Sequence, residues 1–238
     1  MNQGPRAFRM GLRGMAAEAE WKLVRRDIQL ARETGAHLHV AHISTAAAIA
    51  AVREARQRGI HVTGEATPHH FAMIDDDIND YDANFKMNPP LRSRQDRDAV
   101  IAGLLEGTID AIATDHAPHA LYEKRQEFDR APFGIIGLET ALGLAFRILH
   151  AERGMALPQV VRLLTTGPAS VLANTAVGAR GSLRVGSPAD IAIFDPAARW
   201  KFDASKSKSK SRNTPFDGWE LHGRVTATLV GGRWVFRD

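Results

Sequence analysis

Polar side chains follow apolar, strand-like stretches of this sequence, at the point where each stretch ends. In IATDHAPH, residues 112–119, a run of apolar and small residues leads into Asp115 and two histidines. His42 lies at the end of HLHVAHI, and Asn88 lies in FKMNPPLR. The chain has no cysteine, so histidine, aspartate and glutamate are its possible metal ligands. One polar strand end is ordinary, but several in succession predict a functional site.

Parallel strands separated by helices would bring these strand ends together. Strand-like segments occur at residues 37–43, 61–67 and 108–115. Helical patterns occur at residues 16–34, 44–59 and 93–107. This alternation predicts βαβ units and an α/β fold, in which the carboxyl ends of the strands share one edge of the sheet. The polar strand ends expected at that edge are His42, His69 with His70, Asn88 and Asp115.

The segments outside this alternation differ in character. Residues 1–14 have no clear period and are predicted to form a loop. Residues 131–154 should form a loop that continues into a long amphipathic helix, and residues 157–173 one or two shorter helices. Residues 181–195 and 225–238 are short β stretches with glycine turns, which predict a small β appendage at the C-terminus.

Composition and charge argue against several classes of protein. The chain has 238 residues, of which 44% are hydrophobic and 24% charged. It has neither an apolar run long enough to span a membrane nor the apolar core of a secretory signal, so we expect a cytoplasmic protein without a membrane partner. The net charge is +4, and its one dense basic run, KSKSKSR at residues 206–212, is typical of a flexible, solvated loop. We therefore expect no nucleic-acid partner.

Five motifs resemble those of the dihydroorotases, in the cyclic amidohydrolase family of metal-dependent hydrolases. They are HLHVAHIST, FKMNPPLR, IDAIATDHAPH, RAPFG and GSLRVGSPADIAIFD, and they extend over nearly the whole chain. The resemblance implies the C-terminal half of a (β/α)₈ TIM-type barrel with a small β appendage. Residues 1–178 would be the partial barrel, and residues 179–238 would be the C-terminal β segment of the composite domain.

The resemblance also implies a reaction and a site. The family hydrolyses the cyclic amide of (S)-dihydroorotate to N-carbamoyl-L-aspartate, reversibly, in de novo pyrimidine biosynthesis, with one or two zinc ions that activate water. His42 would be a zinc ligand, and Asp115 would bind the other zinc and shuttle the proton. The groups that would contact the substrate are the side chains of Asn88 and His119 and the backbones of Phe133 and Gly134.

Other polar residues in these motifs receive different interpretations. His69 and His70 are adjacent, so on a strand they would face opposite ways, and we expect a structural or supporting role for them. His116 is expected to orient its neighbour Asp115, and His37 and His39 to pack or lie at the surface. Lys86 and Arg92 lie on either side of Asn88. Positive groups such as Arg92 would suit an anionic substrate, although charges on loops are more often solvated.

The resemblance includes parts that this chain lacks. The family's HxHxR motif, which supplies two zinc ligands and the arginine for the substrate carboxylate, does not occur, since HLH is followed by valine and alanine. We expect strands five to eight of the barrel, and no activity from the chain alone. A truncated gene, one part of a split enzyme and a non-catalytic relative remain open. The partners to consider are the missing N-terminal half, a second copy, and aspartate transcarbamoylase, with which a non-catalytic subunit would assemble.

Overall fold

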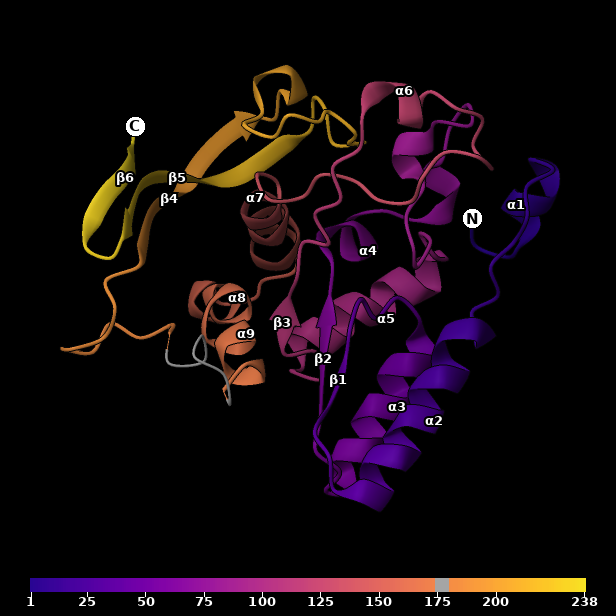
Figure 1. Ribbon diagram of the computed structural model, residues 1–238, viewed down its shortest axis with the longest axis horizontal. Helices are drawn as coiled ribbons and strands as arrows, with labels where there is room; N and C mark the ends of the chain where they lie inside the picture. Colours follow the sequence, from indigo (N-terminus) through magenta and orange to yellow (C-terminus); the bar gives the residue numbers. More distant parts are fainter. Residues whose placement is uncertain (174–179) are drawn as a thin grey trace.

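Helices and parallel strands alternate in the N-terminal half of the computed structural model, which describes residues 1–173 and 180–238 (Figure 1). Its elements up to the parallel sheet are α1 (Pro5–Arg9), α2 (Glu18–Thr34), β1 (Leu38–Val40), α3 (Ala46–Gln57), β2 (Val62–Ala66), α4 (Pro68–Ala72), η1 (Asp75–Asp77), η2 (Ala83–Phe85), α5 (Arg94–Leu105) and β3 (Ala111–Ile112). The elements after it are α6 (Leu121–Lys124), α7 (Ala141–Ala145), η3 (Phe146–Glu152), α8 (Leu157–Leu164), α9 (Thr166–Val171), β4 (Ile191–Lys201), η4 (Ala204–Lys206), β5 (Glu220–Val230) and β6 (Arg233–Arg237).

The first three strands form a parallel sheet in the order β1-β2-β3. The predicted strand segments and the helices before and between them are confirmed, and the predicted α/β class with them. Four parallel strands were expected, but the sheet has three within the described residues. The segment of Asn88 forms no strand because Pro89 and Pro90 follow it, and proline cannot donate a backbone hydrogen bond to a ladder.

The two faces of this sheet have different environments. Along β2, Val62, Gly64 and Ala66 are buried, whereas Thr63 and Glu65 are half-buried. Side chains alternate between the faces of a strand, so β2 has one apolar face and one polar face. The polar face carries Thr63 and Glu65, whose side chains can bond or ionise, and the loops that follow the strands lie at its edge.

The two other predicted segments before the C-terminal strands have different outcomes. Residues 1–14 are not all loop, because Pro5 lies in the first turn of the short helix α1, where its missing N–H removes no helical bond. The loop followed by a helix predicted over residues 131–154 is confirmed, and the helix begins at α7 and continues as the π-helix η3. Pro132 and the left-handed backbone of Gly134, with φ of 112°, keep the preceding residues out of the helix.

The C-terminal strands form an antiparallel sheet in the order β4-β5-β6, as the predicted β appendage requires. Gly231 and Gly232, with φ of 55° and 77°, make the tight turn between β5 and β6. The sheet packs against α7 and η3, and Figure 1 shows it extending away from the parallel sheet. The domain boundary expected between residues 178 and 179 lies outside the described residues.

The basic loop at residues 206–212 is anchored on one side. The carboxylate of Glu139 accepts hydrogen bonds from the Ser207 hydroxyl, from the Lys208 amide at 2.8 Å and from the Ser209 amide at 3.4 Å. Lys208 and Lys210 are exposed, so the lysines are solvated as expected while the serine side is held. Among residues 1–173 and 180–238, none of the helices has the length and apolar character needed to span a bilayer.

Replacing Gly223 with alanine should destabilise the packing of β5 on η3. A Cβ at this position would lie 2.1 Å from Cδ2 of Phe146, and the backbone φ is +75°. Overpacking costs about 1–3 kcal/mol, and a left-handed backbone costs a non-glycine residue roughly 1–2 kcal/mol. The free energy of unfolding in urea measures the sum of the two.

Gly35→Ala is the matched control, because φ is +72° there and nothing lies within 4 Å of the added Cβ. It should lose only the backbone contribution. Equal losses in the two variants would show that Phe146 moves aside and that the contact is not tightly packed.

Candidate active site

A carboxylate between two imidazoles forms the centre of the polar face. Glu65 bonds His42 Nδ1 through Oε1 at 3.0 Å and His39 Nε2 through Oε2 at 3.1 Å. The other ring nitrogen of His39 lies 2.9 Å from the Thr63 hydroxyl. Parallel pairing of β1 with β2 places His39 beside Thr63, and His42 follows β1 in the next loop. His39 is therefore part of the site network and not simply a packing or surface residue.

The hydrogen bonds between Glu65 and the two histidines shift the pKa values of Glu65 and His42. Burial by itself would raise the pKa of Glu65, but the hydrogen bonds to His39 and His42 outweigh it and lower the pKa to about 2. The hydrogen bond to Glu65 in turn raises the pKa of His42, against the opposite effect of burial. A carboxylate on Nδ1 fixes the orientation of the ring and leaves Nε2 as the nitrogen for a ligand.

Asp115 meets His42 at this point. Its Oδ1 lies 3.7 Å from His42 Nε2, and both side chains are half-buried. His42 and Asp115 have positive backbone φ angles, 51° and 47°. Such conformations are costly for non-glycine residues and persist where the surrounding structure enforces them, often at functional sites. Burial raises the pKa of Asp115, which brings its carboxylate closer to the proton affinity that a proton carrier needs.

The donor atoms at this point fit part of a metal site. The two residues were expected to bind different zinc ions, but the 3.7 Å between Nε2 and Oδ1 also suits one shared ion, because two ligands about 2 Å from a tetrahedral zinc are about 3.3 Å apart. A catalytic zinc uses three protein ligands. Within the described residues no group of three or more His, Cys, Asp or Glu is arranged to hold a metal. His42 and Asp115 therefore fit a metal as members of a larger ligand set.

The residues expected on the substrate side lie in neighbouring loops. His119 Nε2 is 2.8 Å from the Phe133 carbonyl oxygen, and a Cβ on Gly134 would be 3.7 Å from the same nitrogen. The Gly134 amide donates to the Lys86 carbonyl at 2.9 Å, which ties this loop to the segment of Asn88. The structure thus brings His119, Phe133 and Gly134 together, while Asn88 is exposed in the adjoining loop.

Asn213 is a site residue that the sequence motifs did not reveal. It is 4% exposed, and its amide nitrogen donates to the carbonyls of Ala117 at 2.9 Å and Gly134 at 3.1 Å. Its amide oxygen accepts from the His119 backbone at 3.2 Å. No local pattern marks it, because its partners lie far earlier in the chain. Glu65 did leave a signal, the alternation of polar and apolar residues in the strand of residues 61–67.

His69 and His70 lie on the helix α4 and not on a strand, so the argument from strand alternation was wrong. Both are buried, and His70 bridges Thr67 Oγ1 at 2.7 Å and the Pro89 carbonyl at 3.0 Å. Burial lowers the pKa of His70 to about 4, so its ring is neutral and supports the loop before Arg92. His116 accepts a hydrogen bond on Nδ1 from a backbone amide at 3.1 Å.

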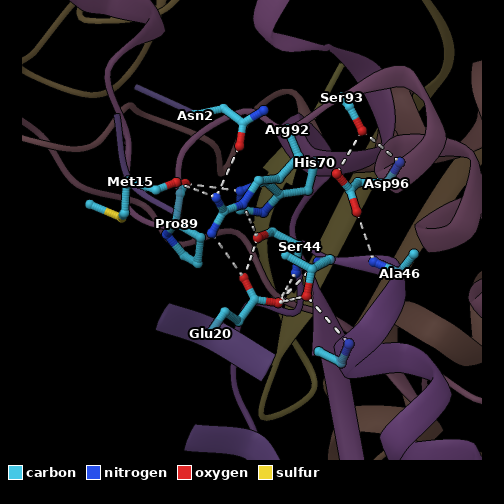
Figure 2. A network of polar contacts seen from close by, with 12 residues as sticks. Asn2, Met15, Glu20, Ser44, Ala46, His70, Pro89, Arg92, Ser93 and Asp96 are labelled. Atoms are coloured by element: carbon cyan, nitrogen blue, oxygen red, sulfur yellow. Dashed lines mark hydrogen bonds and ion pairs between the residues drawn. The ribbon is translucent and has the colours of Figure 1, made fainter. Parts of the chain in front are cut away.

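Arg92 is a buried structural cation, which corrects the expectation that it could meet an anionic substrate (Figure 2). It is 3% exposed, and one nitrogen donates to Asn2 Oδ1 at 3.1 Å and to the Met15 carbonyl at 2.8 Å. A second bonds Ser44 Oγ at 3.1 Å, and a third lies 3.6 Å from Glu20 Oε2. Burial favours the neutral form of a base, but arginine remains charged in proteins, so its partners must compensate the charge.

Glu20 connects this network to the loop of His42. Its Oε1 accepts from the backbone amides of Ser44 and Thr45 and from the Thr45 hydroxyl, each at 2.9 Å. Figure 2 shows Glu20 reaching from its helix toward these groups. The carboxylate therefore fixes the turn that begins two residues after His42. The ion pair of the buried Arg92 with the mostly buried Glu20 thus supports the loop of His42 and the loop that contains Asn88.

Replacing Glu65 with glutamine should lower the pKa of the His42 ring. The amide keeps the shape of the side chain but removes the negative charge that stabilises the protonated ring. NMR titration of the His42 ring in the metal-free chain measures the change. Thr63→Val is the control, because it removes a partner of His39 and leaves the bond between His42 and Glu65 in place. An unchanged His42 pKa in Glu65→Gln would contradict the assigned hydrogen bond.

Replacing Arg92 with methionine should lower the free energy of unfolding by about 3–5 kcal/mol, because it leaves the carboxylate of Glu20 buried without its cation. Arg26→Met, at an exposed ion pair, should change it by about 0–1 kcal/mol. Adding Glu20→Gln to Arg92→Met should recover part of the loss. If the double variant lost the sum of both single effects, the uncompensated charge would not be the cause.

Comparison with known proteins shows the family to which the chain belongs. The sequence pattern of the Amidohydrolase family matches residues 16–235. A dihydroorotase from Solibacter usitatus is 51% identical over 98% of this chain and 53% of its own length. A dihydroorotase from Bacillus caldolyticus is 48% identical over 99% of this chain and 54% of its own length. The chain therefore spans about half the length of these curated relatives.

Solved structures show the same architecture. Dihydropyrimidinase from Brevibacillus agri matches 93% of this chain and 49% of its own, with a TM-score of 0.84 and 28% identity. A D-hydantoinase from Thermus sp. matches 99% of this chain and 52% of its own with a TM-score of 0.86, and at 24% identity it supports the fold alone. Since the family pattern and close relatives extend over nearly all of its residues, the chain belongs to the amidohydrolase family.

Proposed function

We propose that the chain is the C-terminal part of a zinc-dependent dihydroorotase. The enzyme would hydrolyse the cyclic amide of (S)-dihydroorotate to N-carbamoyl-L-aspartate and close it again in the biosynthetic direction. The convergence of His42 Nε2 and Asp115 Oδ1 at 3.7 Å, on loops that follow two strands of one parallel sheet, carries this proposal. The identity of about one half to curated dihydroorotases supports the choice of substrate.

Asp115 is the proposed proton carrier. It would take a proton from the attacking water and return it to the ring nitrogen as the amide bond breaks. Its half-buried position and raised pKa suit a group that is ionised before the reaction and protonated during it. Glu65 would keep the His42 ring in one orientation throughout, because its carboxylate holds Nδ1.

The substrate would be held by the loops beyond the strands. Asn88 is exposed and offers an amide that can pair with both a donor and an acceptor of the ring edge. His119, with the backbones of Phe133 and Gly134, would close the other side. Because Arg92 and Lys86 are engaged within the protein, we assign the anionic group of the substrate to other residues of the complete enzyme.

His42 and Asp115 would hold zinc together with ligands from the rest of a (β/α)₈ barrel. A bound zinc ion would supply Lewis-acid activation of water at neutral pH. The two ligands on this chain are fewer than the three that a catalytic zinc needs, so the chain by itself should bind zinc weakly and below one equivalent. A polypeptide with the first four strands would complete the ligand set.

The test combines zinc binding with turnover. The purified chain should form no carbamoyl aspartate from dihydroorotate, and activity should appear when a polypeptide with the first four strands is added with zinc. In the reconstituted enzyme Asp115→Asn should lower kcat by about 10²–10⁴-fold, because it removes the proton carrier. Asp76→Asn, at an exposed carboxylate, is the control and should leave kcat unchanged.

Three outcomes would contradict the proposal. Tight binding of two zinc ions by the chain alone, with turnover near 1 s⁻¹, the low end for ordinary enzymes, would mean that other residues complete the site. Equal turnover of dihydrouracil and dihydroorotate would remove the substrate assignment. A complex with aspartate transcarbamoylase that survives chelation, with no activity after reconstitution, would favour the non-catalytic alternative.

A further inference from the structure

Two buried lysines lie under the loops of the proposed substrate site. Lys86 is 8% exposed and Lys124 is 7% exposed. The amine of Lys124 donates to the carbonyls of Pro132 and Gly134, each at 3.0 Å, and approaches that of Lys86 at 3.5 Å. The Lys124 amine is thus held by backbone oxygens, an unusual environment for a buried ammonium group.

Lys86 binds the same loop from its other side. Its amine donates to the carbonyls of Asp129 at 3.0 Å and Ala131 at 2.7 Å. It also lies 4.7 Å from the centre of the Phe133 ring, within range of a cation–π interaction. The two amines together therefore contact four carbonyl groups of the loop at residues 129–134.

The bonded atoms connect every segment expected to touch the substrate. The Lys86 carbonyl accepts from the Gly134 amide at 2.9 Å, and Asn88 lies two residues further along the chain. The Phe133 carbonyl, next to the two oxygens that Lys124 binds, lies 2.8 Å from His119 Nε2. Moving the Lys124 amine would release the loop on which these contacts converge.

We propose that Lys124 is a positioning residue of the substrate site, whose ammonium group gathers the backbone oxygens of residues 132 and 134 and thereby sets the positions of Phe133, His119 and the Asn88 segment. The assignment of a substrate to these groups rests on the proposed function. The gathering of the loop rests on the hydrogen bonds alone. An ammonium has three donors, so it can donate to three carbonyls at once, one more than a primary amide or a neutral amine can.

Keeping the Lys124 amine protonated in the folded protein costs free energy. Burial and, to a smaller extent, the nearby charge of Lys86 lower its pKa to about 8, against the opposite effect of Asp82. The folded protein therefore binds this proton less tightly than the unfolded chain does, so the charged amine opposes folding below the unfolded pKa of about 10.4. A buried cation that opposes folding fits a role in the site better than a role in general stability.

Lys124→Met is the test, with Lys210→Met, at an exposed lysine, as the matched control. In the chain alone, hydrogen exchange of the Gly134 amide should become at least about tenfold faster in Lys124→Met. The Ile43 amide, bonded to the Glu65 carbonyl in the sheet region, should be unchanged. Equal acceleration at both amides, or none at Gly134, would overturn the proposal, because a general loss of stability affects both.

The enzyme reconstituted with the missing strands gives a second reading. Lys124→Met should raise KM for dihydroorotate about tenfold with kcat within about twofold, the pattern of impaired substrate positioning. A fall in kcat with unchanged KM would overturn the positioning role. If the wild-type enzyme had no activity while Gly134 exchange still accelerated in the variant, the proposed function would fail and the assignment of the loop contacts would stand.

The wild-type chain decides the matter if Lys124→Met does not fold. The amine loses its proton as the pH rises through about 8. The ¹³C signals of the Pro132 and Gly134 carbonyls should then shift with the same midpoint as the Lys124 ε-carbon. The charged groups around the two amines are Asp82, Asp129 and the N-terminal ammonium of Met1, with Glu123 on the same helix as Lys124. Carbonyl signals that stay constant while the ε-carbon titrates would overturn the proposal.

Discussion

The parallel pairing of β1 with β2 is the constraint on which the candidate site depends. It puts His39 beside Thr63 and within reach of Glu65, and it brings the chain to the loop that holds His42. A shift of the register by one residue would turn Glu65 to the buried face and leave both imidazoles without their carboxylate. That register therefore sets the orientation of the His42 ring, and the ring orientation places Nε2 near Asp115.

Buried charge supports the loops around this centre. Arg92 with Glu20 holds the turn after His42, and Lys86 with Lys124 holds the loop beside His119. Each of the three cations is of a type that is ordinarily solvated, yet each is buried and bonded to oxygens of other segments. Since removing one partner from such a network leaves the other unsatisfied in a medium of low polarity, the loops have little freedom to rearrange.

The C-terminal part of the chain contributes directly to the site. Asn213 follows the basic loop that Glu139 anchors, and its amide nitrogen donates to the carbonyls of Ala117 and Gly134 in two neighbouring loops. The antiparallel sheet is itself fixed against η3 by the close approach of Gly223 to Phe146. A segment that the sequence assigns to an appendage is thus also a structural wall of the proposed site.

The sequence by itself determined most of the helices and the three parallel strands, because periodicity, caps and turn residues act over a few neighbouring positions, and the resemblance of its motifs indicated the family. The ends of strand-like segments marked His42 and Asp115, and the resemblance of the motifs marked His119 and Gly134.

Only the tertiary structure decided the partners. Arg92 is enclosed and not available to a ligand, Glu65 bonds His42, and Asn213 bridges two loops from far along the chain. The physical reason is that strand register and the burial of loops depend on contacts between distant segments, and those contacts leave no periodic trace in the residues that make them.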